Sequence, residues 1–241
     1  MTRIYEALKQ VESEAKARSG VIDFPGAAEQ ETQNAQVSQK MRTLARAIYE
    51  QVPEPRGKVI QFLGVRGGVG TSRTLRAFAQ TCSRRLKRSV LIVCADRDAS
   101  QCMHYSVSPA NSWVDVLHRQ SQPDSALVKI PQAGVSLIKA FDESQSTAAL
   151  LDAPALNAHL DRLRSTFDLI LVDSAPADES SDGIELSTIA DASILVVEAE
   201  KTRWQVAQSV KNSLVARGAN VMGVLLNGVK FHIPQAVYGR L

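Results

Sequence analysis

A glycine-dense stretch between Lys58 and Arg76, KVIQFLGVRGGVGTSRTLR, constrains the fold of this chain more than any other feature. An apolar run, three glycines within four residues and a helix-like segment follow one another in the order strand, loop and helix. In such a loop, successive backbone N–H groups point into one concavity, and the following helix adds the positive end of its dipole. The stretch therefore predicts a phosphate-binding loop, and the alternative is a tight β–α turn without a ligand.

Apolar runs and helix-like segments alternate along the rest of the chain. Continuous Val, Ile and Leu runs indicate strands that are buried on both faces, and hence a mainly parallel sheet. The predicted strands are 58–63, 90–94, 135–140, 169–172, 193–198 and 221–226, and the predicted helices between them are 71–86, 112–119, 149–165 and 203–217. This order predicts an α/β, three-layer fold of the P-loop NTPase type, with helices that flank a mainly parallel central sheet.

The N-terminal part of the chain predicts a helical extension. Residues 3–18 have apolar side chains at three- and four-residue spacing, typical of an amphipathic helix that packs on its own domain or docks on a partner. Residues 19–36 contain Pro, Gly and amides without periodicity, so we expect a linker, followed by a second amphipathic helix at about 37–51. The predicted division into helix with linker, P-loop NTPase-like domain and short tail is 1–36, 37–230 and 231–241.

The composition limits the partners of the chain. Its 241 residues carry a net charge of +3, with 44% hydrophobic and 22% charged residues, which is too little charge to argue for nucleic-acid binding. No apolar run approaches the roughly 20 residues that cross a bilayer, and the start of the chain has no signal-peptide core. We therefore expect a cytoplasmic protein that binds no nucleic acid and does not itself insert into a membrane.

Acidic residues follow two further predicted strands, at the edge where ligands bind in open parallel sheets. Asp173 closes an apolar run, the arrangement in which a carboxylate holds a metal ion near the γ-phosphate of a nucleotide. Asp96 follows the second strand and can hold Mg²⁺ or its water shell, whereas helix capping is the alternative for Asp96 or Asp98. Ser72 is placed to give Mg²⁺ a hydroxyl ligand. Asn227 closes the last strand, where its amide can bind a base edge or initiate a turn.

These motifs in this order resemble the bacterial tyrosine autokinases of exopolysaccharide synthesis (BY-kinases), within the MinD/ParA branch of P-loop proteins. The start TRIYEALKQVE resembles that of the free-standing, exosortase-associated kinases, and LLDAPALNAHLDRLRSTFDLILVDSAP resembles the segment around the family's metal-binding aspartate. The resemblance implies binding of ATP or ADP with Mg²⁺. It also implies a partner, an inner-membrane polysaccharide co-polymerase or chain-length protein that recruits this chain to the membrane, and it is compatible with a homo-oligomer.

The chain departs from the family's pattern at the residues that carry charge. Thr71 stands where the family has the loop lysine, and Arg66 stands at the position of the MinD-type signature lysine. Cys94 replaces the first aspartate of the pair after the second strand, which leaves Asp96. Of the helix motif that the family uses for oligomerisation only the central Arg42 remains, and the tyrosine-rich tail is reduced to Tyr238.

The loss of the loop lysine and of one carboxylate predicts weak or no ATP hydrolysis. A charge-assisted contact is roughly twice as strong as a neutral one, and removal of a preorganised contact in such a site costs about 10²–10³ in rate. We interpret the chain as a degenerate, kinase-like partner or regulator in exopolysaccharide biosynthesis and export. Asp96 and Asp173 are its candidate catalytic residues if it is active, and with Ser72 its candidate Mg²⁺ ligands. The candidate nucleotide-binding residues are Arg66, Gly67, Gly68, Val69, Gly70, Thr71, Ser72 and Asn227.

Three alternatives stay open at this point. An active ATPase or autokinase can use Arg66 or Arg73 in place of the loop lysine, since a guanidinium binds phosphate well. A structural scaffold, in which the phosphate-binding loop stays empty and is here called an empty cradle, needs no nucleotide at all. A positioning ATPase of the MinD/ParA type is less consistent with the sequence, which has no basic stripe.

Overall fold

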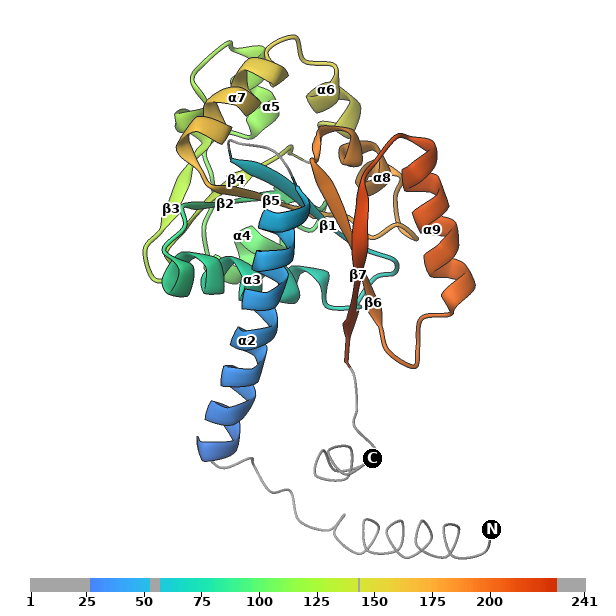
Figure 1. Cartoon of the computed structure of the whole chain (residues 1–241). Coiled ribbons are helices and arrows are strands. Elements are labelled where there is room, and N and C mark those ends of the chain that lie inside the picture. The colour runs from blue at the N-terminus through green and yellow to red at the C-terminus, as the bar shows by residue number, and fades with distance from the viewer. Residues whose placement is uncertain (1–26, 53–56, 143, 229–241) are drawn as a thin grey trace, which may run out of the picture. The chain divides into compact units, whose positions relative to one another are not determined.

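The residues described by the structure, a computed structural model, are 27–52, 57–142 and 144–228 (Figure 1). The chain divides into two compact units, Met1–Gln39 and Lys40–Leu241. The described part of the first unit is helical. The predicted helix at 3–18 and the predicted tail with Tyr238 lie outside the described residues.

A seven-stranded sheet forms the centre of the second unit, in the order β3-β4-β2-β5-β1-β6-β7. The strands are β1 (Lys58–Gly64), β2 (Val90–Ala95), β3 (Val128–Ile130), β4 (Val135–Lys139), β5 (Leu169–Ser174), β6 (Ala192–Glu198) and β7 (Val221–Asn227). Neighbouring strands run parallel, except that β3 is antiparallel to β4. Every residue of β1, β2 and β5 is buried, which explains their continuous apolar sequences.

Helices of the second unit, among them α2 from Lys40 onward, cover both faces of this sheet (Figure 1). The helices of the described chain are α2 (Ala27–Gln51), α3 (Thr71–Leu86), α4 (Ser100–Tyr105), α5 (Trp113–His118), α6 (Thr147–Leu151), α7 (Leu156–Thr166), α8 (Asp182–Leu186) and α9 (Trp204–Ala216), with 3₁₀ turns at Pro123–Ala126 and Ser187–Ile189. Ile48, Phe78 and Cys102 bring the second-unit part of α2, α3 and α4 into one core cluster. The helices α5 to α9 pack on the opposite face. The predicted three-layer α/β arrangement around a mainly parallel sheet is confirmed.

The strand register brings three strand ends together. β5 lies between β1 and β2, and Asp173 pairs with Phe62 on one side and with Cys94 on the other. Because parallel strands end at the same edge, the segments that follow β1, β2 and β5 converge there.

Some local predictions were wrong. α2 begins at Ala27, so residues 27–36 are helical rather than a linker; they are rich in Ala, Glu and Gln, which favour helix without any apolar periodicity. The helix predicted at 149–165 is interrupted between α6 and α7, where Pro154 cannot continue a helix. β3, α4 and α8 were not predicted, because elements of three to six residues show too few periods to recognise.

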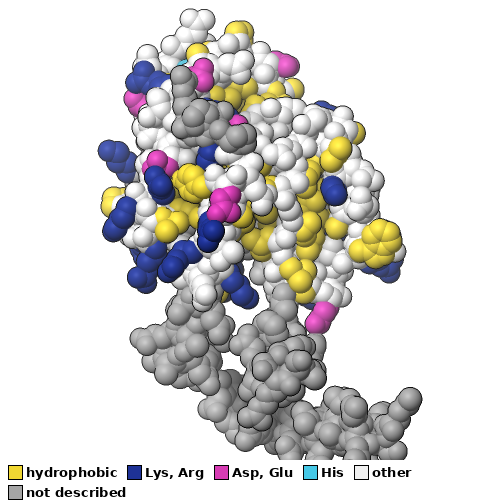
Figure 2. Space-filling model, in the orientation of Figure 1, with side chains coloured by type: hydrophobic (Ala, Val, Ile, Leu, Met, Phe, Trp, Pro, Cys, Tyr) yellow, Lys and Arg dark blue, Asp and Glu magenta, His cyan; other side chains and the backbone are white. Residues whose placement is uncertain are grey.

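One face of the second unit combines basic and hydrophobic surface. Figure 2 shows Lys and Arg side chains gathered over α3 and hydrophobic side chains over the edge strand β7. The large exposed hydrophobic residues on α9 and β7 are Trp204, Val206, Val215, Val224 and Leu226. No helix in the described part of the chain combines the length and the apolarity needed to cross a membrane.

Candidate functional site

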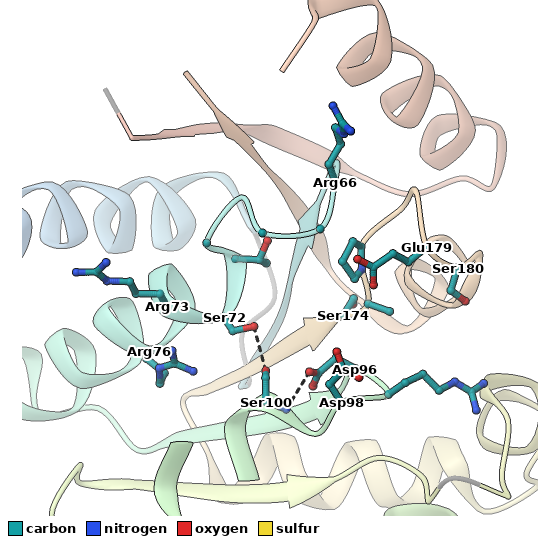
Figure 3. A pocket seen from close by; sticks show the side chains of 17 residues that line it. Arg66, Ser72, Arg73, Arg76, Asp96, Asp98, Ser100, Ser174, Glu179 and Ser180 are labelled. Atoms are coloured by element: carbon teal, nitrogen blue, oxygen red, sulfur yellow. Dashed lines mark hydrogen bonds between the residues drawn. The ribbon is translucent and has the colours of Figure 1, made fainter. Parts of the chain in front are cut away.

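A cavity of about 550 Å³ lies at the carboxyl ends of β1, β2 and β5 (Figure 3). Its walls are the glycine loop with the start of α3, the segment after β2 and the segment after β5. This is the edge at which open parallel sheets bind ligands, and the volume suits a small molecule. The structure therefore brings Ser72 and Asp96, which are far apart in the sequence, into one cavity.

The glycine loop has a conformation that depends on its glycines. Gly68 and Gly70 have φ angles of 75° and 84°, in the left-handed region that favours glycine. Gly70 is the N-cap of α3, and a Cβ on Gly67 would collide with the carboxylate of Glu179. α3 has 16 residues, and its free N–H groups and positive dipole end lie where the loop meets the cavity.

Thr71 is the first residue of α3 and lines the cavity. Its side chain is buried and lies against Gly64, so that a Cβ on Gly64 would come within 2.5 Å of Oγ1. A threonine hydroxyl supplies no positive charge to a phosphate. Among the residues that line the cavity there is no lysine, and its cations are all arginines: Arg66, Arg73, Arg76 and Arg97.

Arg66 is engaged by an acidic residue of the chain itself. Its Nε lies 3.5 Å from Oδ2 of Asp178, and in Figure 3 its side chain extends away from Ser72 and Ser100. The other oxygen of Asp178 accepts a hydrogen bond of 2.9 Å from the backbone N–H of Gly67. One donor of the loop and one of the candidate phosphate-binding cations are thus both occupied by the same carboxylate.

Asp173 is fully buried at the end of β5. Its Oδ2 accepts a hydrogen bond of 2.6 Å from Nε2 of Gln101 and a longer one of 3.5 Å from Oγ of Ser100. Its Oδ1 has no hydrogen-bond partner among the described residues. Burial, with a smaller contribution from the charge of Asp96, raises the pKa of Asp173 to about 7.

Asp96 lines the cavity and also bonds the first backbone N–H of α4. Its Oδ2 accepts a hydrogen bond of 2.9 Å from the backbone N–H of Ser100, at the start of α4 (Figure 3). Its Oδ1 accepts one of 3.1 Å from the thiol of Cys94. The N-cap of α4 is Ala99, so neither Asp96 nor Asp98 is the N-cap residue, although Asp96 bonds the first N–H of the helix. A hydrogen bond with Cys102, together with burial, raises the pKa of Cys94, so this position carries a neutral thiol instead of a carboxylate.

The oxygen atoms on this side of the cavity fit a magnesium ion. Mg²⁺ prefers oxygen ligands, uses one or two carboxylates and takes the rest from phosphates and water. The carboxylate of Asp96 and the hydroxyl of Ser72, which line the cavity, are of this kind. The unpartnered Oδ1 of Asp173 is a third such oxygen, but it is buried and Asp173 is not among the lining residues. The described residues contain no group of three or more His, Cys, Asp or Glu side chains able to hold a metal.

Asn227 supports the glycine loop from β7. Its Nδ2 donates a hydrogen bond of 2.8 Å to the carbonyl of Val69, and it lies where a Cβ on Gly70 would be. Binding of a base edge by this amide stays a prediction. Arg42 is exposed on α2, and its part in oligomerisation also stays a prediction.

The residues at the site that sequence reasoning missed include Ser100, Gln101 and Asp178. Their only signal is that they belong to the segments that follow β2 and β5. The serine bridges Ser72 and Asp173, with an Oγ–Oγ distance of 3.1 Å to Ser72. The contacts of these residues join positions that are 28 to 111 residues apart in the sequence, so no local sequence pattern predicts them.

A glycine loop before a helix, with a buried aspartate at the end of a neighbouring parallel strand, defines a P-loop NTPase-like protein. Residues 58–213 match the family model described as cellulose biosynthesis protein BcsQ, and the chain belongs to this family.

Known relatives agree with this class and with the predicted resemblance to bacterial tyrosine kinases. The chain is 22% identical to the tyrosine-protein kinase ptk of Acinetobacter johnsonii over 80% of its own length, but it spans only 26% of that kinase. It is 25% identical to the tyrosine-protein kinase CpsD of Streptococcus pneumoniae, with 76% of this chain and 81% of the kinase covered.

Solved structures show the same fold. The kinase domain of the Escherichia coli tyrosine kinase ETK has a TM-score of 0.72 at 18% identity, with 82% of this chain and 77% of that domain covered. The cell division protein MinD of Aquifex aeolicus has a TM-score of 0.56 at 25% identity, covering 76% and 73% of the two chains. A plasmid partition protein of Borrelia burgdorferi, solved with AMPPNP bound, has a TM-score of 0.57 at 17% identity, covering 77% and 81%.

Proposed function

We propose that this chain binds a nucleotide with little or no hydrolysis and acts as a regulator in the biosynthesis of cellulose or a related exopolysaccharide. Thr71 is the observation that carries the proposal, because it places a neutral hydroxyl at the start of α3 in a cavity with no lysine among its lining residues. Cys94 is a second neutral replacement, beside Asp96. The description of the family, a cellulose biosynthesis protein, supports a role in polysaccharide biosynthesis. The tyrosine-kinase relatives support a kinase-like protein.

In this proposal the glycine loop binds the phosphates of ATP or ADP. The loop's N–H groups and the positive end of α3 supply the attraction that the lysine no longer gives. Ser72, Asp96 and Asp173 hold the Mg²⁺ side, and the ion, when bound, neutralises phosphate charge. The partition protein that was solved with AMPPNP has the same fold, which supports nucleotide binding by a chain of this fold.

We further propose that the chain works in the cytoplasm with an inner-membrane polysaccharide co-polymerase that recruits it. The resemblance to exopolysaccharide kinases supports this partner, and the exposed Arg42 is available for contacts between copies of the chain. Co-purification from cells with the membrane protein of the same pathway tests the partnership. Recovery of the chain from the membrane fraction in cells that lack that protein contradicts it.

The impaired chemistry is tested by turnover of radiolabelled ATP. Wild type and Asp173→Ala are compared at the same Mg²⁺ and nucleotide concentrations. We expect no turnover of wild type above that of Asp173→Ala. Turnover clearly above this control, and lost when Arg66 or Arg73 is changed to Ala, contradicts the proposal and establishes an active enzyme.

An active ATPase or autokinase is the second candidate, since Arg73 and Arg76 both line the cavity from α3. Either guanidinium can supply the positive charge of the missing lysine, although its planar fork needs a different approach to the phosphate. Under this alternative, Arg73→Ala or Arg76→Ala lowers the turnover of ATP strongly. If wild type and both variants turn over ATP equally, the alternative of an active enzyme that uses Arg73 or Arg76 is excluded.

A further inference from the structure

Gln101 is a fully buried side chain beside the cavity to which the proposed function gives no role. It lies on α4, and its amide bonds three groups on two other elements. Nε2 donates to Oδ2 of Asp173 at 2.6 Å and to the backbone carbonyl of Ser72 at 3.2 Å, while Oε1 accepts from Nη1 of Arg76 at 3.3 Å. An amide has two N–H donors and one carbonyl oxygen, so the contacts use all three groups.

The two oxygens of Asp173 are in different situations. Oδ2 accepts from Gln101 and, at 3.5 Å, from Ser100, whereas Oδ1 is buried without a partner in the described part of the chain. A carboxylate that is held through one oxygen presents the other in a fixed direction, which is how outer-shell amides orient metal ligands. The same Nε2 also reaches the carbonyl of Ser72, whose hydroxyl lines the cavity.

We propose that Gln101 is a positioning residue for the cation side of the cradle. Its amide holds Asp173 through Oδ2 and ties it to the first turn of α3, so that Oδ1 of Asp173 and the hydroxyl of Ser72 keep a fixed relation for Mg²⁺. The inference rests on the proposed nucleotide and Mg²⁺ binding.

A purely structural role for Gln101 is the alternative. A buried amide costs free energy unless it is hydrogen-bonded, and an apolar side chain of the same length fills the same space without that cost. What the amide adds to packing is direction, because its donors reach β5 and α3 at once. Gln101→Met therefore separates the two roles: it keeps the length of the side chain and removes the hydrogen bonds.

The role of Gln101 can be tested without any turnover by titration with Mn²⁺, in place of Mg²⁺, in the presence of ADP. Electron paramagnetic resonance measures the Mn²⁺ that stays free in solution. We expect Gln101→Met to weaken Mn·ADP binding about tenfold, the low end for loss of a group that orients a metal ligand. Affinity for ADP in EDTA should stay within about twofold, since no cation is then held. Gln208→Met, on the exposed surface of α9, is the matched control and should bind as wild type does.

The same titration in an Asp173→Asn background shows whether Gln101 acts through Asp173. We expect the tenfold effect of Gln101→Met to fall below about twofold there, as coupled residues behave in a double-mutant cycle. The inference is overturned if Gln101→Met has the same effect in the wild-type and Asp173→Asn backgrounds, or if Gln101→Met binds Mn·ADP as tightly as wild type does. Either result leaves the proposed function standing. Absence of any ADP binding by wild type overturns the proposed function and this inference together. If Gln101→Met fails to fold by circular dichroism, Gln101→Asn, which withdraws the amide by one methylene, takes its place with the same expectation.

Discussion

Thr71 and Cys94 place neutral side chains on two different elements that meet at the cavity. Thr71 starts α3, and Cys94 pairs with Asp173 across the boundary between β2 and β5. The raised pKa of Cys94 keeps its thiol protonated, so it cannot stand in for a carboxylate. Gly68 and Gly70 retain the left-handed conformations of the loop. The cradle thus combines its shape with a reduced set of charges.

Removal of the negative charge at Asp178 should strengthen nucleotide binding. The carboxylate engages both Arg66 and the N–H of Gly67, and it repels phosphate. Because the pair with Arg66 is partly exposed and worth about 0.2–1 kcal/mol, we expect Asp178→Asn to raise ADP affinity about two- to fivefold in calorimetry. Asp124→Asn, which breaks the surface pair with Arg162, is the control. Unchanged or weaker binding by Asp178→Asn would show that this carboxylate does not compete with phosphate.

The stability of the protein should depend on the protonation of Asp173. Folding raises its pKa from 3.8 to about 7, so between these values the native state holds a proton that the unfolded chain has lost, and stability falls as pH rises. This destabilisation by the buried carboxyl of Asp173 is absent below about pH 4 and reaches its full size above about pH 7. Asp173→Asn removes it, and we expect the variant to gain about 1 kcal/mol or more over wild type between pH 5 and pH 8 in urea unfolding with EDTA. A pH-independent difference contradicts the raised pKa.

At the scale of elements, strand position could be predicted better than helix position. β1, β2 and β5 are buried at every residue, so their apolar runs mark their limits well. α3 was predicted with its observed ends because the glycine loop fixes its start. The first turns of α2 were missed, since Ala, Glu and Gln form helix without an apolar stripe, and β3 was missed because three residues carry no pattern.

The anchoring of α3 beneath the glycine loop should depend on one aromatic residue. Phe78 is fully buried, and its ring centroid lies 5.7 Å from that of Phe62 on β1. Truncation of a buried Phe costs about 3–5 kcal/mol because a cavity is left behind. We expect Phe78→Ala to lower the free energy of unfolding by this amount in chemical denaturation. Val215→Ala, on the exposed side of α9, should change it by less than about 0.5 kcal/mol. A loss for Phe78→Ala as small as that of the control would be incompatible with this packing.

At the scale of the whole molecule, the strand order decides which residues form the site. With β5 between β1 and β2, the glycine loop, Asp96 and the segment that carries Asp178 meet at one edge. The sequence predicted the edge itself, because parallel strands end together. It could not predict that Gln101 bonds Asp173 or that Asp178 bonds Gly67, since these contacts depend on how separate loops fold over the edge.

Restoration of both lost charges tests whether the rest of the site is intact. In the double variant Thr71→Lys with Cys94→Asp, a cation returns to the start of α3 and a carboxylate to β2. We expect ATP turnover to rise by about 10²–10³ over wild type, the range for a restored preorganised contact. Thr71→Lys alone should recover less. If the double variant turns over no more ATP than wild type does, residues other than Thr71 and Cys94 are responsible for the low activity.

The central claim, a cradle that binds nucleotide with little chemistry, is tested most directly by calorimetric titration of the purified chain with ADP and with ATP. Each titration is run with Mg²⁺ and again with EDTA. We predict saturable one-to-one binding with a Kd on the order of micromolar in Mg²⁺, weaker binding in EDTA, and unconverted ATP at the end of the titration. Absence of binding at millimolar nucleotide, or ATP consumed during the measurement, would contradict the account.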